Sequence, residues 1–373
     1  MANLSIKDFT RWMIPRMTMA GCHITDIEGT LGRITSKEMW PTEWGKTADK
    51  YLTIAQEAEK KGHRHTAYQM YIYAMLYYYE GQKILFEESK RKVELFKQMM
   101  DIYKKIMEFC PYPIERVEVP YNGIKLPGYL HTPIGNGPFP CLLFIQGMDS
   151  SKEEWHNWGR FAIERGYSLF CIDTPGHGET RHLQKVHLDI PNLVKAASVC
   201  REYLANRFDI IPDKIGVLGN CLGSNYGFQA AAFDEKFICC LIILVIAEFK
   251  TKTGEKDVPK WFIDMVRFFT GDSTGNKDAF EKYRKDFNLE NMDKKVKCST
   301  HLFHPEEDNW LDWDQVKKMA NFIKGPITIT PVKGAPVFEG NSMSHLVPIY
   351  EQIHWVLPVA FDWVEEQFKN KSK

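Results

Sequence analysis

Short apolar runs that alternate with helical periodicity occupy the chain from about residue 140 onward. Each run is apolar at nearly every position rather than at alternate ones, as in strands whose two faces are both covered. The runs lie at residues 140–145, 167–173, 215–218 and 239–246, with helical patterns at 155–164 and 191–207 between them. Alternation of this kind is typical of a doubly wound, mostly parallel sheet. The pattern therefore predicts an α/β fold.

The earlier part of the chain has a different pattern, with no strand signal from residue 44 to residue 110. Alanines and tyrosines recur there at spacings of three and four, which is typical of helices. Gly62 falls in the predicted turn between two antiparallel helices, and Gly81 lies near the middle of a longer second helix. This region is therefore expected to be all helical.

A change of period near residue 116 marks a boundary between two domains. Alternating apolar residues flank Asn122-Gly123, the sequence of a tight hairpin turn. We expect a helical N-terminal domain over residues 1–115 and an α/β domain over residues 116–373. An aromatic-rich, charged stretch over about 250–296 interrupts the alternation and predicts a lid insertion. The remaining predicted elements are a strand at 298–304, a helix at 314–322, a last strand at 327–332 and a closing helix at 357–368.

Gly219, Cys221 and Gly223 form a Gly-x-Cys-x-Gly pattern where a strand meets a helix rich in small residues. This is the spacing of a nucleophile elbow, in which a strained turn presents a nucleophile at the carboxyl edge of the sheet. The glycines allow the helix to pack close to the strand. A buried structural cysteine is the alternative interpretation. Cys221 is thus the candidate nucleophile, at the position where serine is usual.

The order of further side chains along the chain matches that nucleophile. Asp308 follows a late strand and His345 follows the last one, so nucleophile, acid and histidine occur in the α/β-hydrolase order. We expect His345 to take the proton of Cys221 and Asp308 to orient the imidazole. Glu306 and Glu307 are rivals of Asp308 because the loop holds three acids. A surface or capping histidine and a solvated acidic turn are the alternatives.

An oxyanion site needs two backbone N–H groups beside the nucleophile. Leu222, directly after the cysteine, supplies one by its position. Met148 supplies the other from the turn after the first apolar strand, and Gly147 gives the backbone room there. Gln146 and Lys152 in the same loop are interpreted as turn or helix-cap residues.

A glycine-rich segment, residues 173–179, follows another strand in the manner of a phosphate loop. It lacks both the Gly-Lys-Ser/Thr ending and the Gly-x-Gly-x-x-Gly spacing, so nucleotide binding is rejected. His177 and Glu179 are candidate substrate-binding residues, with a tight structural loop as the alternative. Glu248, which follows the strand at 239–246, is a further candidate for contacting substrate or the histidine.

Charge and cysteine content exclude several classes of protein. Among 373 residues, 48 lysines and arginines balance 48 aspartates and glutamates, which gives no overall attraction to nucleic acid or an anionic membrane. The nine cysteines are scattered, and no Cys-x-x-Cys pair indicates zinc. There is no signal-peptide pattern, and the longest apolar run, 237–247, is too short to cross a bilayer. We expect a cytoplasmic protein that acts on a small molecule without a metal or an organic cofactor.

Several of these motifs together resemble one branch of the α/β-hydrolases. It contains the fermentation-respiration-switch-like proteins, 2,6-dihydroxypseudooxynicotine hydrolase and the fungal polyketide-shortening hydrolases. The resembling stretches are the elbow, residues 147–154 and 173–180, and, in the helical region, residues 25–33, 40–44 and 62–78. The resemblance implies an α/β-hydrolase fold with a helical cap domain that helps to cover the active site and often mediates dimers. It puts the nucleophile, acid and histidine on Cys221, Asp308 and His345.

Cys221 departs from the serine that is usual in this branch. Dienelactone hydrolase is similar in carrying a cysteine on the same fold, so a thioester-forming triad is expected. The resemblance implies hydrolysis of a C–C bond next to a ketone or of an ester or lactone, and the aromatic cap and lid favour an aromatic or polyketide-like substrate. Acyl transfer or cyclisation through the same thioester stays open. Two further alternatives also stay open. The chain is then a non-catalytic binding protein on a hydrolase fold, or Cys221 replaces a natural serine by engineering.

Overall fold

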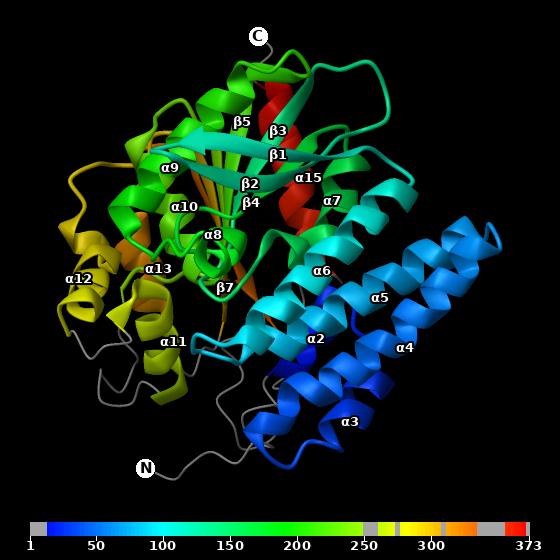
Figure 1. Ribbon diagram of the computed structural model, residues 1–373. Coiled ribbons are helices and arrows are strands. Elements are labelled where there is room, and N and C mark those ends of the chain that lie inside the picture. Colours follow the sequence, from blue (N-terminus) through cyan, green and yellow to red (C-terminus); the bar gives the residue numbers. More distant parts are fainter. Residues whose placement is uncertain (1–12, 249–259, 273–276, 307–310, 334–354, 371–373) are drawn as a thin grey trace. The chain divides into compact units, whose positions relative to one another are not determined.

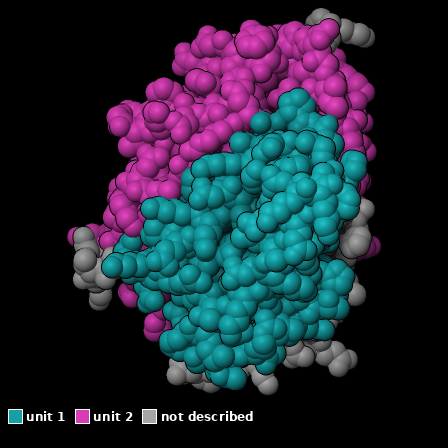
Figure 2. Space-filling model, turned by 45° about the vertical axis from the view of Figure 1, so that its right-hand side comes forward, with its two compact units in different colours: residues 1–114, 153–157 teal, residues 115–152, 158–373 magenta. Residues whose placement is uncertain are grey.

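The computed structural model describes residues 13–248, 260–272, 277–306, 311–333 and 355–370. The chain divides into two compact units, which Figure 2 colours separately. Unit 1 comprises Met1–Ile114 and the short segment Glu153–Asn157, and unit 2 comprises Glu115–Lys152 and Trp158–Lys373. The break after Ile114 falls where the sequence changes from helical to alternating periodicity.

Unit 1 is built from helices, blue to cyan in Figure 1. Its elements are α2 (Met13–Ala20), α3 (Ile24–Leu31), η1 (Lys37–Met39), α4 (Trp40–Lys60), α5 (Arg64–Lys83) and α6 (Lys90–Phe109). The turn between α4 and α5 contains Gly62 at φ +73°, a left-handed conformation that glycine adopts without strain. α5 packs against both α4 and α6. Most of its second half is buried, which explains why it lacks a continuous polar face.

The structure corrects one predicted boundary in this region. The helix expected to continue through Gly81 to about residue 110 ends at Lys83, and a separate helix, α6, begins at Lys90. The hydroxyl of Ser89 accepts a hydrogen bond from the backbone N–H of Lys92 at 3.4 Å. Because a serine here satisfies a donor that has no intrahelical partner, it favours the start of a new helix.

A cluster of charges is buried in unit 1. The carboxylate of Glu154 accepts hydrogen bonds from Arg16 at 2.9 Å, Lys83 at 3.1 Å and the hydroxyl of Tyr79 at 2.6 Å. Burial raises the pKa of Glu154, but the two cations outweigh it and bring the pKa to about 2. Burial raises the pKa of Glu80, whose Oε2 has no hydrogen-bond partner among the described residues. The pKa values of the two buried carboxyls are therefore shifted in opposite directions.

Unit 2 is an eight-stranded sheet with helices on both sides (Figure 1). Its strands are β1 (Ile114–Tyr121), β2 (Ile124–His131), β3 (Phe139–Ile145), β4 (Ser168–Ile172), β5 (Ile210–Asn220), β6 (Cys239–Ile243), β7 (Ser299–Pro305) and β8 (Ile327–Val332). They lie in the order β1-β2-β4-β3-β5-β6-β7-β8, antiparallel between β2 and β4 and parallel from β4 to β8. Asn122 and Gly123 form the β1–β2 turn with φ of 46° and 79°. The predicted, mostly parallel α/β sheet is confirmed.

The helices of unit 2 follow the strands in alternation. Over the described residues they are η2 (Lys152–Trp155) and α7 (His156–Ile163), of which Glu153–Asn157 belong to unit 1, then α8 (Gly178–His182), α9 (Ile190–Ala205), α10 (Leu222–Phe233), α11 (Lys260–Thr270), α12 (Lys277–Phe287), η5 (Leu289–Asn291), α13 (Trp313–Ala320) and α15 (Leu357–Asn370). α9 and α10 pack on β5, and α15 packs on β6. α11 and α12 lie between β6 and β7 in the chain, where the insertion was predicted.

Two strand boundaries differ by three residues or more from those predicted. β5 begins at Ile210, before the expected residue 215. β6 ends at Ile243 rather than at residue 246, because Leu244 adopts a positive φ of 67° that does not continue a strand. The N–H of Leu244 donates to the carbonyl of Phe303 in β7 at 2.9 Å. The chain thus turns at the carboxyl edge of the sheet earlier than the apolar pattern indicates.

Candidate active site

Cys221 lies between the last residue of β5 and the first residue of α10, at the carboxyl edge of the sheet. Its φ of 57° and ψ of −129° are a sparsely populated conformation for a residue with a side chain. A Cβ at Gly219 would lie 2.3 Å from the carbonyl oxygen of Gly223, and one at Gly223 would lie 2.4 Å from that of Ile145. The glycines are therefore required by close backbone contacts, and the turn has the geometry of a nucleophile elbow.

The loop after β3 passes directly beside this turn. A Cβ at Gly147 would lie 3.5 Å from Cβ of Cys221 and 3.8 Å from the backbone nitrogen of Leu222. Met148 follows and is fully buried. Among the described residues, the backbone N–H groups of Met148 and Leu222 donate to no backbone carbonyl. The structure thus brings together Cys221 and the three residues predicted to surround an oxyanion.

Asp173 connects this loop to the loop after β4. Its carboxylate accepts hydrogen bonds from Gln146 Nε2 at 2.7 Å, from the backbone N–H of Lys152 at 2.9 Å, from Lys152 Nζ at 2.8 Å and from the N–H of Glu179 at 2.8 Å. The side chains of Lys152 and Asp173 are both 0% exposed. Gln146 and Lys152 therefore do more than form a turn, because they bind the acid that begins the next loop.

The carboxylate of Glu179 belongs to the same ion cluster. It accepts hydrogen bonds from Lys152 at 3.1 Å and from both terminal nitrogens of Arg116 at 3.0 and 2.9 Å. Bidentate pairing of this kind fixes the orientation of the carboxylate. Its oxygens are thus directed at two cations of the protein, and we retain only His177 of this loop as a substrate-binding candidate.

Three aromatic side chains occupy the region next to the elbow. The ring of His177 meets that of Tyr226 edge on, with centroids 5.8 Å apart and planes at 69°. The hydroxyls of Tyr226 on α10 and Tyr283 on α12 are hydrogen-bonded at 2.9 Å. Burial raises the pKa of both phenols, and the negative charge of a Cys221 thiolate raises it further. The insertion between β6 and β7 therefore contributes a side chain to the surroundings of Cys221.

The other predicted site residues either pair with lysines or lie outside the described residues. Glu248 is half-buried and forms an ion pair with Lys318 at 2.7 Å. Glu306 is exposed and lies 3.7 Å from Lys333. Asp308, its rival Glu307 and His345 lie outside the described residues. The acid and the histidine of the triad thus stay predictions from the sequence.

Several broader expectations concern the whole chain. All nine cysteines lie in described ranges, and the structure joins none of them in a disulfide. Over the described ranges, no group of three or more His, Cys, Asp or Glu side chains is arranged to hold a metal ion. None of the described helices is both long and apolar enough to span a membrane.

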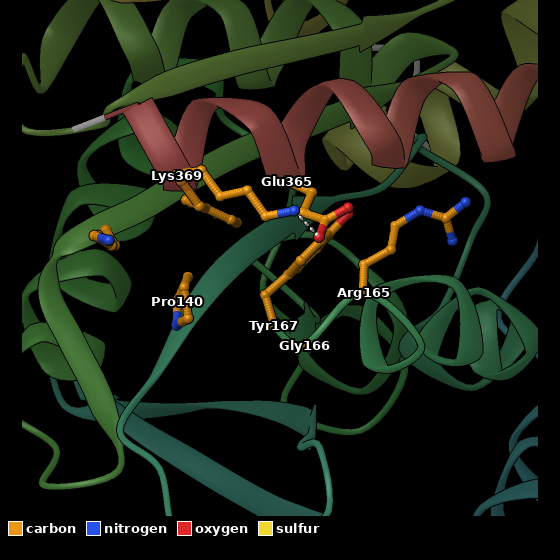
Figure 3. Close-up of a pocket in the computed structure, with 8 residues that line it drawn as sticks. Pro140, Arg165, Gly166, Tyr167, Glu365 and Lys369 are labelled. Carbon is orange, nitrogen blue, oxygen red and sulfur yellow. Dashed lines mark ion pairs between the residues drawn. The ribbon is translucent and has the colours of Figure 1, made fainter. Parts of the chain in front are cut away.

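A separate hollow lies at the amino-terminal ends of β3, β4 and β5, the sheet edge opposite Cys221 (Figure 3). Pro140, Arg165, Tyr167, Glu365 and Lys369 are among its lining residues, and its volume is about 270 Å³. Glu365 and Lys369, one turn apart on α15, pair with each other at 2.5 Å. This volume is below the range of about 300–1,000 Å³ for small-molecule sites. Because two of its charged groups already pair with each other, we assign no ligand to this hollow.

Comparison with known proteins shows which family this chain belongs to. A family model described as esterase FrsA-like matches residues 30–296. The chain belongs to the FrsA-like esterase family. It is 29% identical over 309 residues to 2,6-dihydropseudooxynicotine hydrolase of Paenarthrobacter nicotinovorans, covering 79% of this chain and 77% of that protein. It is 27% identical over 264 residues to the 20-hydroxy-prefusarin hydrolase FUS2 of Gibberella moniliformis, covering 65% of this chain and 61% of that protein.

Solved structures agree with this family membership at the level of the fold. The crystal structure of 2,6-dihydroxy-pseudo-oxynicotine hydrolase is similar with a TM-score of 0.80 and 22% identity, covering 96% of this chain and 97% of that one. The structure of wild-type AbyA5 is similar with a TM-score of 0.67 and 16% identity, covering 97% and 99%. This FrsA-like chain is therefore an enzyme of the α/β-hydrolase type, as the motifs indicated.

Proposed function

We propose that this enzyme acts by nucleophilic acyl transfer, with the thiol of Cys221 as the nucleophile. The observation that carries the proposal is the backbone of Cys221, with its positive φ at the junction of β5 and α10. Strain of this kind costs about 1–3 kcal/mol. A structural cysteine gains nothing from it, whereas a nucleophile gains exposure at the edge of the sheet. The strain therefore supports a chemical role for this side chain.

The proposed reaction has two stages. His345 takes the thiol proton as the sulfur of Cys221 bonds to the carbonyl carbon, while Asp308 orients the imidazole. The N–H groups of Leu222 and Met148 stabilise the oxyanion. Its collapse breaks the bond from the carbonyl carbon to the leaving group, which takes the proton from His345. Water, with its proton removed by His345, then attacks the thioester and releases the acid and the thiol.

The proposed substrates are aromatic or polyketide-like carbonyl compounds. They are cleaved at a C–C bond next to a ketone or at an ester or lactone bond. The similarity to 2,6-dihydropseudooxynicotine hydrolase and to a fungal hydrolase supports this class. The phenols of Tyr226 and Tyr283 beside Cys221 support an aromatic or partly unsaturated ligand.

Intact-mass spectrometry after mixing with candidate substrates tests the proposal. We expect an acyl adduct on Cys221 that, once formed, persists longer in His345→Ala, because deacylation then lacks its base, and that is absent in Cys221→Ala. Cys221→Ser is the matched variant that keeps a nucleophilic side chain. Turnover that persists unchanged in Cys221→Ala would refute the proposal. An added alcohol or amine that captures the acyl group in place of water would instead identify an acyltransferase or cyclase using the same thioester.

Two properties implied by the family resemblance complete the proposal. We propose a homodimer, which light scattering of the purified protein checks, and a cytoplasmic location, which fractionation of the source cells checks. A monomer over the micromolar range would refute the first, and enrichment outside the cytoplasm would refute the second.

A further inference from the structure

The imidazole of His177 is fully buried but only partly hydrogen-bonded. It immediately precedes α8 in the loop after β4 and is 0% exposed. Nδ1 lies 3.0 Å from the hydroxyl of Thr174. Nε2, on the opposite side of the ring, has no hydrogen-bond partner among the described residues. Because a buried polar atom without a partner is unfavourable, such an atom in a native protein needs an explanation.

His177 shares its surroundings with the nucleophile. Its ring borders Tyr226, and the Tyr226 hydroxyl is bonded to that of Tyr283. Both phenols are close enough to Cys221 for a thiolate charge to raise their pKa in addition to the effect of burial. Tyr226 lies on α10, the helix that begins directly after Cys221, and His177 follows the carboxyl end of β4, so these groups lie at the same edge of the sheet. The carboxyl ends of β3, β4 and β5, which are in register, meet at this edge.

We propose that His177 is a specificity-determining residue whose Nε2 hydrogen-bonds an uncharged hydroxyl or carbonyl oxygen in the acyl part of the substrate held on Cys221. This inference rests on the proposed function of Cys221 and names a feature of its substrate. An unpartnered nitrogen in the free enzyme then gains its partner when the substrate binds.

The charge of the imidazole selects the type of oxygen. Burial lowers the pKa of His177 to about 4, so the ring is neutral near pH 7 and carries one N–H. Depending on which nitrogen holds that proton, Nε2 donates or accepts. A substrate hydroxyl can pair with Nε2 whether Nε2 donates or accepts, and a substrate carbonyl oxygen can pair with it when Nε2 donates. Burial of a permanently charged carboxylate or phosphate is unfavourable unless a cation pairs with it, and a neutral ring does not provide that cation.

The acyl part of the substrate is the part that can contact His177 throughout the proposed reaction. It stays bonded to the sulfur of Cys221 after the leaving group has departed, so an oxygen within it can keep a hydrogen bond to Nε2 in both stages. β4, which leads into His177, is separated from β5 only by β3.

Matched pairs of p-nitrophenyl esters test this inference. The pairs are m-hydroxybenzoate with benzoate, lactate with propionate, and acetoacetate with butyrate, each corrected for its rate of alkaline hydrolysis. We expect wild type to favour the oxygenated member of at least one pair by about tenfold or more in kcat/KM, because a site built to bind an oxygen rejects the analogue that lacks it. His177→Phe should bring that ratio close to one. His177→Gln, which keeps a hydrogen-bonding group, should retain part of it.

His182→Phe is the matched control, because His182 is the last residue of α8, the short helix that His177 precedes, and packs against Phe268 and Phe269. It should keep the wild-type ratio. Equal corrected rates within every pair for wild type, or an unchanged ratio in His177→Phe, would overturn the assignment of His177. The wild-type comparison decides even where His177→Phe does not fold. Absence of both p-nitrophenol release and a Cys221 adduct with every ester would instead overturn the proposed function.

Discussion

Replacing Asp173 by asparagine tests whether the buried ion cluster positions the oxyanion loop. Oδ1 of Asp173 accepts from Gln146 Nε2 and from the N–H of Lys152, and Oδ2 accepts from Lys152 Nζ and from the N–H of Glu179. The side chain of asparagine has one oxygen and one NH₂ group. Either the two donors to Oδ1 or the two donors to Oδ2 therefore face an NH₂ group in place of an acceptor. The change therefore loosens the connection between the loop that holds Met148 and the loop after β4.

The structure gives the expected size of both effects. The side chain of Lys152 is 0% exposed, and its ion pair with Glu179 at 3.1 Å would stay. Removal of one partner of a buried ion pair costs about 3–5 kcal/mol, and the remaining partner puts the loss near the lower end. Folded domains have about 5–15 kcal/mol of stability, so Asp173→Asn should stay folded at room temperature. Loss of one oxyanion donor lowers the rate by about 10²–10³-fold, so we expect acylation of Cys221 to fall about a hundredfold.

Two reactions of the same thiol separate this effect from general damage. Acylation by p-nitrophenyl acetate develops an oxyanion, whereas alkylation by iodoacetamide displaces iodide at a saturated carbon and develops none. We expect Asp173→Asn to slow acylation while alkylation stays within about threefold. Asp209→Asn, which removes a 2.8 Å partner of Arg207 just before β5, should change neither rate. Equal losses in both reactions, or an unchanged acylation rate, would refute the reasoning.

The remaining predictions concern stability. Glu154→Gln should lower the free energy of unfolding by about 3 kcal/mol at pH 7 and by less than half of that at pH 3. A carboxylate whose folded pKa is lowered to about 2 contributes stability above its unfolded pKa and loses it as pH falls. Urea denaturation at the two pH values checks this, and an equal loss at both would contradict it. Glu80→Gln should gain stability relative to wild type as pH rises from 4 to 8, because a buried carboxyl with a raised pKa destabilises once it ionises; a gain that falls with pH in the same titration would contradict it. Gly223→Ala should destabilise the fold by about 3 kcal/mol or more, because the added Cβ meets the Ile145 carbonyl. Gly166→Ala, with φ +76° and open space around it, should cost about 1 kcal/mol. Thermal melting compares the two variants, and similar losses would contradict the steric argument.

Local pattern predicts most of this fold because the sheet is parallel and covered on both sides. A strand buried on both faces must be apolar at consecutive positions, and β3, predicted over residues 140–145, runs over Phe139–Ile145 and is buried from Cys141 onward. The break between α5 and α6 was missed because apolar periodicity continues through it and only the Ser89 cap marks it. The end of β6 was missed because the apolar run continues through Leu244, whose backbone turns to meet β7.

The candidate site was predictable where the backbone itself imposes the residue type. Gly219 and Gly223 are required by contacts that leave no room for a Cβ, so their spacing around Cys221 carries structural information. Tyr226 and Tyr283 give no such information in the sequence, because an aromatic residue on a helix is typical of any core. Their hydroxyls meet only after the insertion folds against α10, across 57 positions of sequence. Contacts of this kind depend on tertiary structure and have no local sequence signal.

The charges beside the elbow cancel, and this constrains the chemistry. Lys152, Arg116 and Lys125 carry three positive charges, and Asp173, Glu179 and Glu118 carry three negative ones, so the whole ion cluster is neutral. A net positive charge there would bind the carboxylate product of hydrolysis as well as the oxyanion of the transition state, and would slow product release. Backbone N–H groups stabilise the oxyanion without such a charge. A neutral cluster and a neutral His177 therefore favour an uncharged carbonyl substrate whose negative charge develops only during the reaction.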